Sequence, residues 1–172
     1  MTKILPELAD LATRIDELFA DPDNARRHPE RNIAALCESL SRFGQLKPVV
    51  AVRGSGLVVS GNARLEAARR LGWDHLAAVW FDDEEEARAY AVVDNRTAEL
   101  AEWHGARLVG ALDELEPAGF APAALGFEPA EVERARRKAA TGQPVDAEIN
   151  DPPAHQYRCP RCGHEWDDEA DR

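Results

Sequence analysis

Long hydrophobic runs are absent from this sequence of 172 residues. No apolar segment approaches the ~20 residues that a membrane-spanning helix needs, and the N-terminus lacks the basic and then apolar pattern of a secretory signal. Cysteine is scarce, with three residues in the chain, and a disulfide is not expected in a reducing cytoplasm. We therefore expect a cytoplasmic protein that has no membrane partner.

Internal repeats are absent too, and the length allows one domain of ordinary size with a tail, or two small domains. The hydrophobic content of 44% is enough for a core, and the net charge is −11. The charge is uneven, because residues 26–70 hold nine basic residues and three acidic ones. A basic segment in an acidic protein indicates a local anion site more than a broad DNA-binding face, and a solvated basic surface is the alternative.

Hydrophobic periodicity predicts several elements in the first half of the chain. Residues 1–10 are expected to be loosely held. Residues 13–19 are predicted to form a short strand because a turn-rich stretch follows them, and a helix is the alternative because their apolar residues also fit one helical face. A helical stripe over residues 33–43 ends at Gly44. Residues 49–52 and 57–59 are predicted to be strands joined by a hairpin turn.

The stretch of residues 57–73 breaks at Ser60-Gly61 and restarts as a short, basic, amphipathic helix. Gly61 permits a turn that a residue with a Cβ would resist, and Asn62 is the expected cap. A helix N-terminus offers free N–H groups and the positive end of the helix dipole, and Arg64 lies one turn further on. The segment therefore predicts an anion site, and an ordinary strand and helix with surface arginines is the alternative.

The second half of the chain is predicted to be mostly helical. A strand over residues 76–81 is followed by an acidic run that begins a helix, which carries the chain toward Asp94 and Asn95. Further helices are expected over residues 100–115 and 129–139. Residues 141–154 have the composition of a linker.

Three blocks in one order, GQLKPVV, SGNARLEAARRLGW and VVDNRTAELAEW, resemble the ParB/sulfiredoxin-like domain. The resemblance covers residues 11–103 and is closest to the stand-alone phage-type "ParB-like nuclease domain" proteins, which are related to the domain fused to DNA methyltransferases. It implies an α+β fold with a small mixed sheet and flanking helices, in a bacterial or phage-infected cell. A helical extension (104–140), the linker (141–154) and a small tail (155–172) would follow.

The same resemblance implies a site for a nucleoside triphosphate, CTP in the partition proteins, together with Mg2+. Residues 44–50 resemble the segment that lies against the base, residues 61–64 resemble the phosphate-binding GERR motif, and Asp94-Asn95 takes the place of a Glu-Asn pair that handles magnesium and triphosphate. Arg26 and Arg27 would add a cationic wall. The residues expected to bind nucleotide are Arg26, Arg27, Gly44, Gln45, Pro48, Gly61, Asn62, Arg64, Asp94 and Asn95.

Two departures from the family argue against catalysis. Asn62 and Ala63 stand where GERR has its Glu and first Arg, which removes a charge pair, and Asn62 also replaces the reactive cysteine of sulfiredoxin. We therefore expect a DNA-associated accessory protein that binds a nucleoside triphosphate. Its expected partner is DNA or a DNA-processing protein, and a homodimer is one of the assemblies that the sequence allows. The alternatives are a metal-dependent nuclease or nucleotidase that uses Asp94, and a ligand-free structural adaptor.

The tail contains a second motif, YRCPRCGHEW over residues 157–166. Cys159 and Cys162 have the spacing of a zinc knuckle, in which two thiolates grip one metal ion. A closed site needs four ligands, which His155 and His164 could complete, or two chains could each supply one knuckle. The motif predicts Zn2+, and a half-ribbon without metal is the alternative.

Overall fold

The computed structural model describes residues 2–140, 157–158 and 165–166. A five-stranded mixed sheet with the order β1-β5-β3-β4-β2 forms its centre. The strands are β1 (Ala12–Arg14), β2 (Phe19–Ala20), β3 (Val49–Val52), β4 (Leu57–Ser60) and β5 (His75–Phe81). The helices are α1 (Glu30–Phe43), α2 (Asn62–Arg70), α3 (Glu84–Leu100), α4 (Gly105–Leu115) and α5 (Pro129–Ala140).

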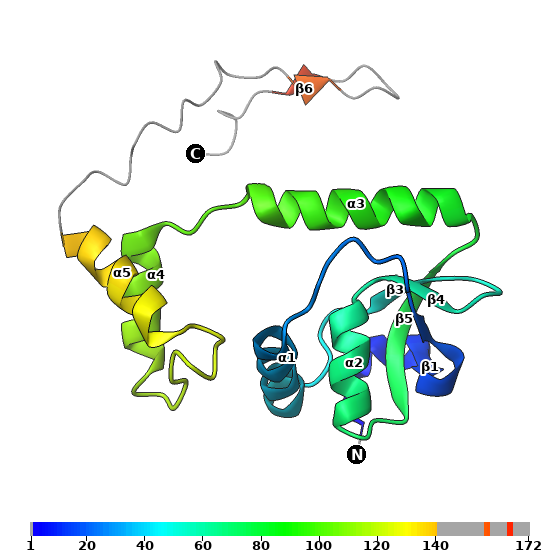
Figure 1. Cartoon of the computed structure of the whole chain (residues 1–172), viewed down its shortest axis with the longest axis horizontal. Helices are drawn as coiled ribbons and strands as arrows, with labels where there is room; N and C mark the ends of the chain where they lie inside the picture. Colours follow the sequence, from blue (N-terminus) through cyan, green and yellow to red (C-terminus); the bar gives the residue numbers. More distant parts are fainter. Residues whose placement is uncertain (1, 141–156, 159–164, 167–172) are drawn as a thin grey trace.

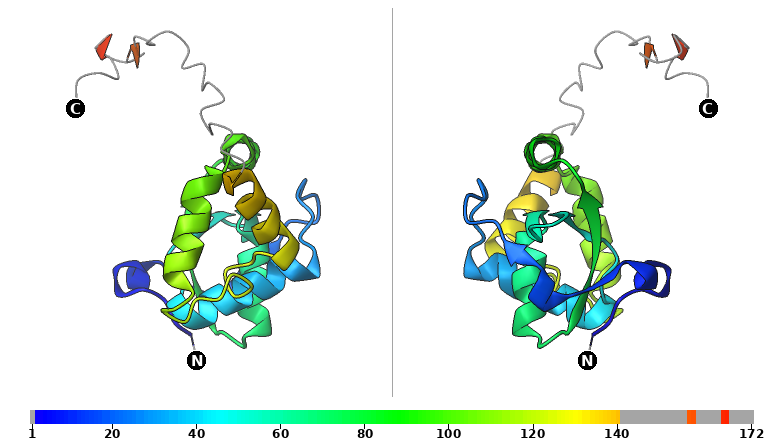
Figure 2. Two further views of the ribbon diagram at one scale, coloured as in Figure 1. Left: turned by 90° about the vertical axis from the view of Figure 1, so that its left-hand side faces the viewer. Right: turned by 90° about the vertical axis from the view of Figure 1, so that its right-hand side faces the viewer.

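The sheet is covered on both faces, and the core is divided accordingly. The larger buried cluster lies between the sheet and the paired helices α1 and α2, and includes Ile33, Leu40, Leu65 and Leu76. A smaller cluster on the other face includes Ala87 of α3. Figure 1 shows α3 crossing above the sheet, and in Figure 2 it is seen end-on. The α+β fold with a mixed sheet and flanking helices is therefore confirmed.

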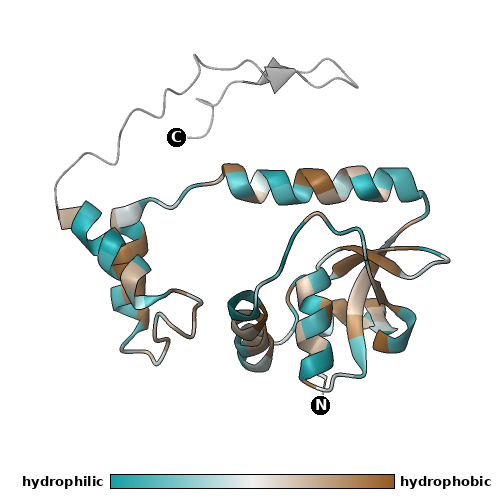
Figure 3. Ribbon diagram, in the orientation of Figure 1, coloured by the Kyte–Doolittle hydropathy of each residue, from teal (hydrophilic) through white to brown (hydrophobic). Residues whose placement is uncertain are grey.

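The elements that depend on local signals lie where the sequence predicts them. Helix α1 ends at Gly44, whose φ of 75° is the left-handed conformation that favours glycine. Strands β3 and β4 form the expected antiparallel hairpin. Figure 3 shows that hydrophobic residues concentrate on the strands, as burial on both faces of the sheet requires.

The single strand predicted over residues 13–19 is wrong. The chain forms β1, then a 3-10 turn over Ile15–Glu17, and then β2. These strands lie at opposite ends of the sheet order, with β1 antiparallel to β5 and β2 parallel to β4. The turn buries Ile15 and Leu18 in the core, and this tertiary burial divides the predicted strand into two short ones.

The first residues are not loosely held. Ile4 forms a parallel bridge with Gln45, and the carbonyl of Lys3 accepts a hydrogen bond of 2.8 Å from the Gln45 amide. A 3-10 helix follows over Pro6–Leu11. The first segment is therefore attached to the loop that links α1 to β3.

The helix boundary predicted near residue 100 is displaced. Helix α3 continues to Leu100, and α4 begins at Gly105 after His104, whose ring Nδ1 accepts a hydrogen bond from the Arg107 amide. Helix α5 lies where the sequence predicts it. None of the helices described in residues 2–140 is long and apolar enough to cross a membrane.

Helices α4 and α5 form a hairpin that docks on α1 through two arginines. The Arg31 guanidinium donates to Glu128 (2.9 Å) and Glu131 (2.5 Å). Arg42 donates to the carbonyl of Gly119 (2.8 Å) and lies 3.6 Å from the ring centre of Phe120. The extension is thus tied to the domain by polar and cation–π contacts across about three turns of one helix.

Gln45 is a fully buried polar residue that connects two parts of the sheet. Its side-chain oxygen accepts from the Ala77 amide (2.6 Å), and its side-chain nitrogen donates to the carbonyls of Ala77 (2.9 Å) and Lys47 (3.0 Å). Because Ala77 precedes the point where β5 pairs with β3, the Gln45 amide supplies the partner that a neighbouring strand would give.

We predict that Gln45→Met lowers the free energy of unfolding by about 2 to 4 kcal/mol, since it leaves buried backbone groups of Ala77 without partners. Urea unfolding measures the loss. Leu46→Met is the matched control, because Leu46 is 55% exposed and its replacement should change stability by less than about 0.5 kcal/mol. Equal stability of the two variants would contradict this role of Gln45.

Candidate functional site: an anion-binding cleft

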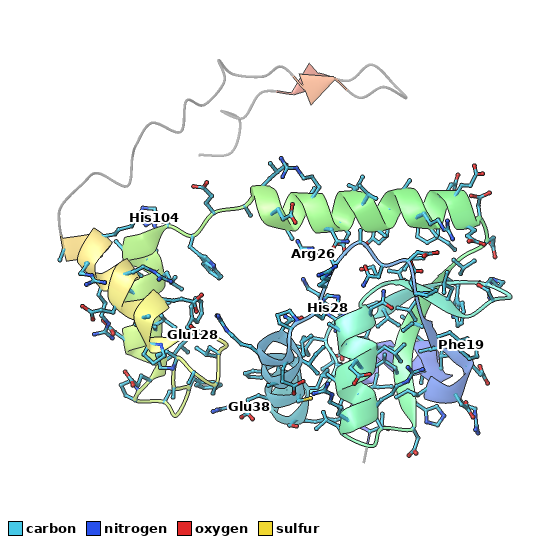
Figure 4. All side chains as sticks on the ribbon, viewed as in Figure 1. Phe19, Arg26, His28, Glu38, His104 and Glu128 are labelled. Atoms are coloured by element: carbon cyan, nitrogen blue, oxygen red, sulfur yellow. The ribbon has the colours of Figure 1, made fainter. Side chains whose placement is uncertain are left out.

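A cleft of about 840 Å³ lies between the start of α2, the loop before α1 and the middle of α3. Figure 4 shows Arg26 and His28 in the space between α3 and the pair α1 and α2. The cleft brings together eight of the ten residues predicted to bind nucleotide: Arg26, Arg27, Pro48, Gly61, Asn62, Arg64, Asp94 and Asn95.

Gly61 makes the turn that opens α2 into this cleft. Its φ of 94° lies in the left-handed region, and a Cβ there would stand 2.8 Å from Val49 Cγ1 and 3.1 Å from Arg64 Nη1. Glycine is therefore required both by the backbone conformation and by the close approach of β3. The sequence prediction of this turn is confirmed.

The N-terminus of α2 carries backbone donors that no side chain of residues 2–140 caps. Gly61 is the N-cap and makes no side-chain cap bond, and the first helical hydrogen bond runs from the Leu65 amide to the Gly61 carbonyl (3.0 Å). The amides of residues 62–64 precede that bond, so they remain available at the positive end of the helix dipole. This end of α2 suits an anion.

Arg64 is a half-buried cation that has no hydrogen bond or ion pair within residues 2–140. Burial lowers its pKa, and the charge of Asp94 opposes that shift. The guanidinium nevertheless stays charged at neutral pH, because the ordinary pKa of an arginine lies far above neutral. The cleft therefore contains a positive charge that interacts with Asp94 but forms no ion pair with any residue that the structure describes.

Asn62 does not cap the helix, contrary to the sequence prediction. It is buried, its side-chain nitrogen donates to the Val58 carbonyl (2.9 Å), and its oxygen accepts from the Asp21 amide (3.0 Å). These two bonds fasten the loop after β2 to the end of β4. The Asn62 side chain is thus occupied by backbone groups, and Gly61 takes the N-cap position.

Asp94 and Asn95 connect α3 to the other walls of the cleft. Ser60 Oγ donates to Asp94 Oδ2 at 2.7 Å. Arg26 donates to the backbone carbonyl of Asn95 (3.3 Å) and pairs with Glu99 (3.0 Å). The middle of α3 is therefore held at two points, one at the end of β4 and one on the loop before α1.

The cleft is strongly positive, with four cationic side chains and one carboxylate in its lining. The cations are Arg26, Arg27, Lys47 and Arg64, and the carboxylate is Asp94. The prediction missed Lys47, although it lies inside the quoted GQLKPVV block. It also missed Ser60 and His28, which carry no motif of their own but directly precede or follow predicted residues.

Gly44 and Gln45 are not part of the cleft lining. Gly44 is the C-cap of α1, and a Cβ there would meet the backbone of Lys3. Gln45 is fully buried, and its side chain is bonded to backbone. The structure gives both residues a part in the fold.

No protein-family model matches the chain. Over 65 residues it is 32% identical to the ParB-like nuclease domain-containing protein YnaK of Escherichia coli (strain K12), an alignment that covers 38% of this chain and 74% of YnaK. The chain belongs to the family of ParB-like nuclease domain proteins.

One solved structure of a ParB protein agrees with this ParB-like fold. The C-terminally truncated chromosome-partitioning protein ParB from Caulobacter crescentus, in complex with CTP-gamma-S, is 20% identical with a TM-score of 0.59, covering 75% of this chain and 77% of that one. Sulfiredoxin from Arabidopsis thaliana is 17% identical with a TM-score of 0.39, covering 47% of this chain and 93% of that one. The ParB likeness shows a shared fold.

The predicted zinc ligands of this ParB-like chain, Cys159, Cys162, His155 and His164, lie outside the described residues. Next to them the structure describes two short antiparallel strands, β6 (Tyr157–Arg158) and β7 (Glu165–Trp166). The zinc site stays a prediction.

We predict that Gly61→Ala destabilises the ParB-like chain by about 1 to 3 kcal/mol more than Gly72→Ala. Both glycines have left-handed φ, but a Cβ at Gly72 meets nothing within 4 Å, whereas one at Gly61 collides with Val49. Gly72→Ala therefore reports backbone strain alone, of about 1 kcal/mol. Urea unfolding of the two variants makes the comparison, and losses of the same size would show that β3 does not approach Gly61 as described.

Proposed function

We propose that this protein is a DNA-associated accessory protein whose cleft binds a nucleoside triphosphate, and that binding rather than catalysis is its role. The observation that carries the proposal is the Arg64 guanidinium, which has no ion pair among the described residues, beside the start of α2, which has no side-chain cap there. Together they offer a triphosphate both a fixed positive charge and directed N–H groups.

The remaining cleft lining suits the rest of a nucleotide. Its volume of about 840 Å³ falls within the ordinary range for small-molecule sites. Apolar residues lie beside the cations, which gives a base and its sugar a surface to pack against; they are Leu36, Pro48, Val50, Val79, Tyr90 and Ala98. The cleft therefore combines a polar end for phosphates with an apolar surface.

Magnesium fits this proposal as a companion of the nucleotide. Mg2+ is commonly bound through one or two carboxylates together with substrate phosphates. Asp94 uses one carboxylate oxygen to accept from Ser60, which leaves the other oxygen for a cation, and the Asn95 side chain is next to it in sequence. Within the described residues no three His, Cys, Asp or Glu side chains gather into a metal site, so we propose that phosphates complete the coordination.

The nuclease-domain name of the relative YnaK supports the DNA part of the proposal, and a ParB neighbour supports the nucleotide part. The ParB neighbour from Caulobacter crescentus was solved with CTP-gamma-S, so CTP is the first ligand to test. The site supports binding over repeated catalysis, because Ala63 brings no polar side chain and Asn62 is occupied by backbone groups. A nuclease would gather several carboxylates around its metals, whereas Asp94 is the single carboxylate in the described lining. For the tail we propose a zinc site built on Cys159 and Cys162.

Calorimetric titration with CTP, ATP and GTP in the presence of Mg2+ tests the proposal. We predict that wild type binds at least one of them and that Arg64→Met weakens the affinity about 10- to 100-fold, because one charge-assisted contact is lost. Arg53→Met is the matched control, since Arg53 pairs with Asp82 outside the cleft and its loss should leave affinity unchanged.

Two other results would point elsewhere. If wild type binds no nucleotide, the proposed function is wrong and a ligand-free adaptor is favoured. If nucleotide is turned over repeatedly and Asp94→Ala abolishes the turnover, the protein is an enzyme. Arg64→Met should remain folded, because it removes a half-buried charge that has no ion pair within the part of the chain that the structure describes. Its unfolding curve serves as the check.

A further inference from the structure

We infer that Ser60 is a phosphorylation site that the protein modifies itself, using the γ-phosphoryl group of a bound nucleoside triphosphate. The inference rests on the proposed nucleotide binding and goes beyond it, because it assigns a covalent step to the Ser60–Asp94 pair. One group is transferred per chain, so the step needs no repeated turnover.

The geometry of a nucleophile and its base is present in the cleft. Ser60 is the last residue of β4 and directly precedes Gly61, the N-cap of α2. Its hydroxyl donates to Asp94 Oδ2 at 2.7 Å, the distance of a charge-assisted hydrogen bond. Among the described lining residues, Ser60 is the one aliphatic hydroxyl, and it is partly exposed to the cleft.

The surroundings match what phosphoryl transfer requires of a protein. The step depends on positioning and on stabilising negative charge around the transferred group. Arg64 and the open amides of α2 line the same cleft as the Ser60 hydroxyl. A triphosphate held by those groups would therefore lie beside a hydroxyl that a carboxylate already orients.

The atoms of the step balance. The Ser60 oxygen forms a bond to the γ-phosphorus while the bond from that phosphorus to the β–γ bridging oxygen breaks, and the nucleoside diphosphate leaves with that bond's electrons. The hydroxyl proton passes to Asp94 and then to water. The co-reactant is the nucleoside triphosphate, brought as its magnesium complex.

The product would change the contact that holds α3. A phosphate on Ser60 sits well at the N-terminus of α2 and near Arg64. It would also replace the hydrogen bond to Asp94 with two like charges. Phosphorylation therefore replaces the Ser60–Asp94 hydrogen bond, one of the two attachments of the middle of α3, with repulsion between phosphate and carboxylate. The contacts of Arg26 with Asn95 and Glu99 remain.

The test incubates the full chain with Mg2+ and each γ-labelled nucleoside triphosphate, and locates the label by peptide mass spectrometry. We expect label on Ser60 in wild type, none at this position in Ser60→Ala, and a rate about 100-fold lower in Asp94→Asn. Ser55→Ala is the control, because Ser55 lies in the hairpin turn and accepts from the Leu57 amide. It should be labelled at the wild-type rate.

Three results would overturn the inference. Calorimetric binding of nucleotide by wild type without any label would reject the Ser60 step and leave the proposed function standing. Absence of both binding and label would reject both. Equal labelling of wild type and Asp94→Asn would show that Asp94 is not the base and would reject the Ser60–Asp94 step.

Discussion

The close approach of β3 to the turn at Gly61 is the constraint on which the site depends. The turn lets the chain leave β4 and enter α2 while Val49 lies against it. Small buried side chains then let α2 pack closely on the core; they are Ala63, Ala67 and Ala68. Because the N-cap residue is a glycine, which has no side chain, the helix N-terminus faces the cleft without a side-chain cap.

Arg64 follows from the same turn. One helical turn after the N-cap, its guanidinium folds back over Gly61 and becomes half-buried without a partner among the described residues. An unpaired cation in such a place lowers stability unless an anion accompanies it. An anionic ligand that binds only the folded protein would therefore raise stability as it binds. The positive charge of the cleft and the open N-terminus of α2 therefore both result from the turn at Gly61, and both favour an anionic ligand.

The sequence predicts the parts of this site that depend on short-range signals. The Gly61 turn, the hairpin of β3 and β4, and the end of α1 at Gly44 each follow from residues within a few positions of one another. The grouping of Arg26, Arg64 and Asp94 in one cleft came from the family resemblance, and the structure does bring them together.

The parts that were missed depend on distant partners. Gln45 is read as a ligand from its motif, but Ala77, 32 residues away, engages its side chain. Asn62 looks like a cap until Asp21, 41 residues earlier, takes its oxygen. The docking of α4 and α5 relies on Arg31 and Arg42, whose acceptors lie 77 or more residues further along. Sequence patterns within a few positions cannot predict hydrogen bonds between residues that are so far apart in the chain.

The central claim is that the Arg64 guanidinium is the cation that receives the ligand. Arginine side-chain NMR of 15N-labelled protein, titrated with the magnesium complex of CTP, tests it most directly, with Arg64→Met assigning the signal. The account predicts a selective shift of the Arg64 Nε–H resonance, while that of Arg70, already paired with Glu30 and Glu66, stays in place. Saturating CTP that leaves the Arg64 signal unmoved would contradict it.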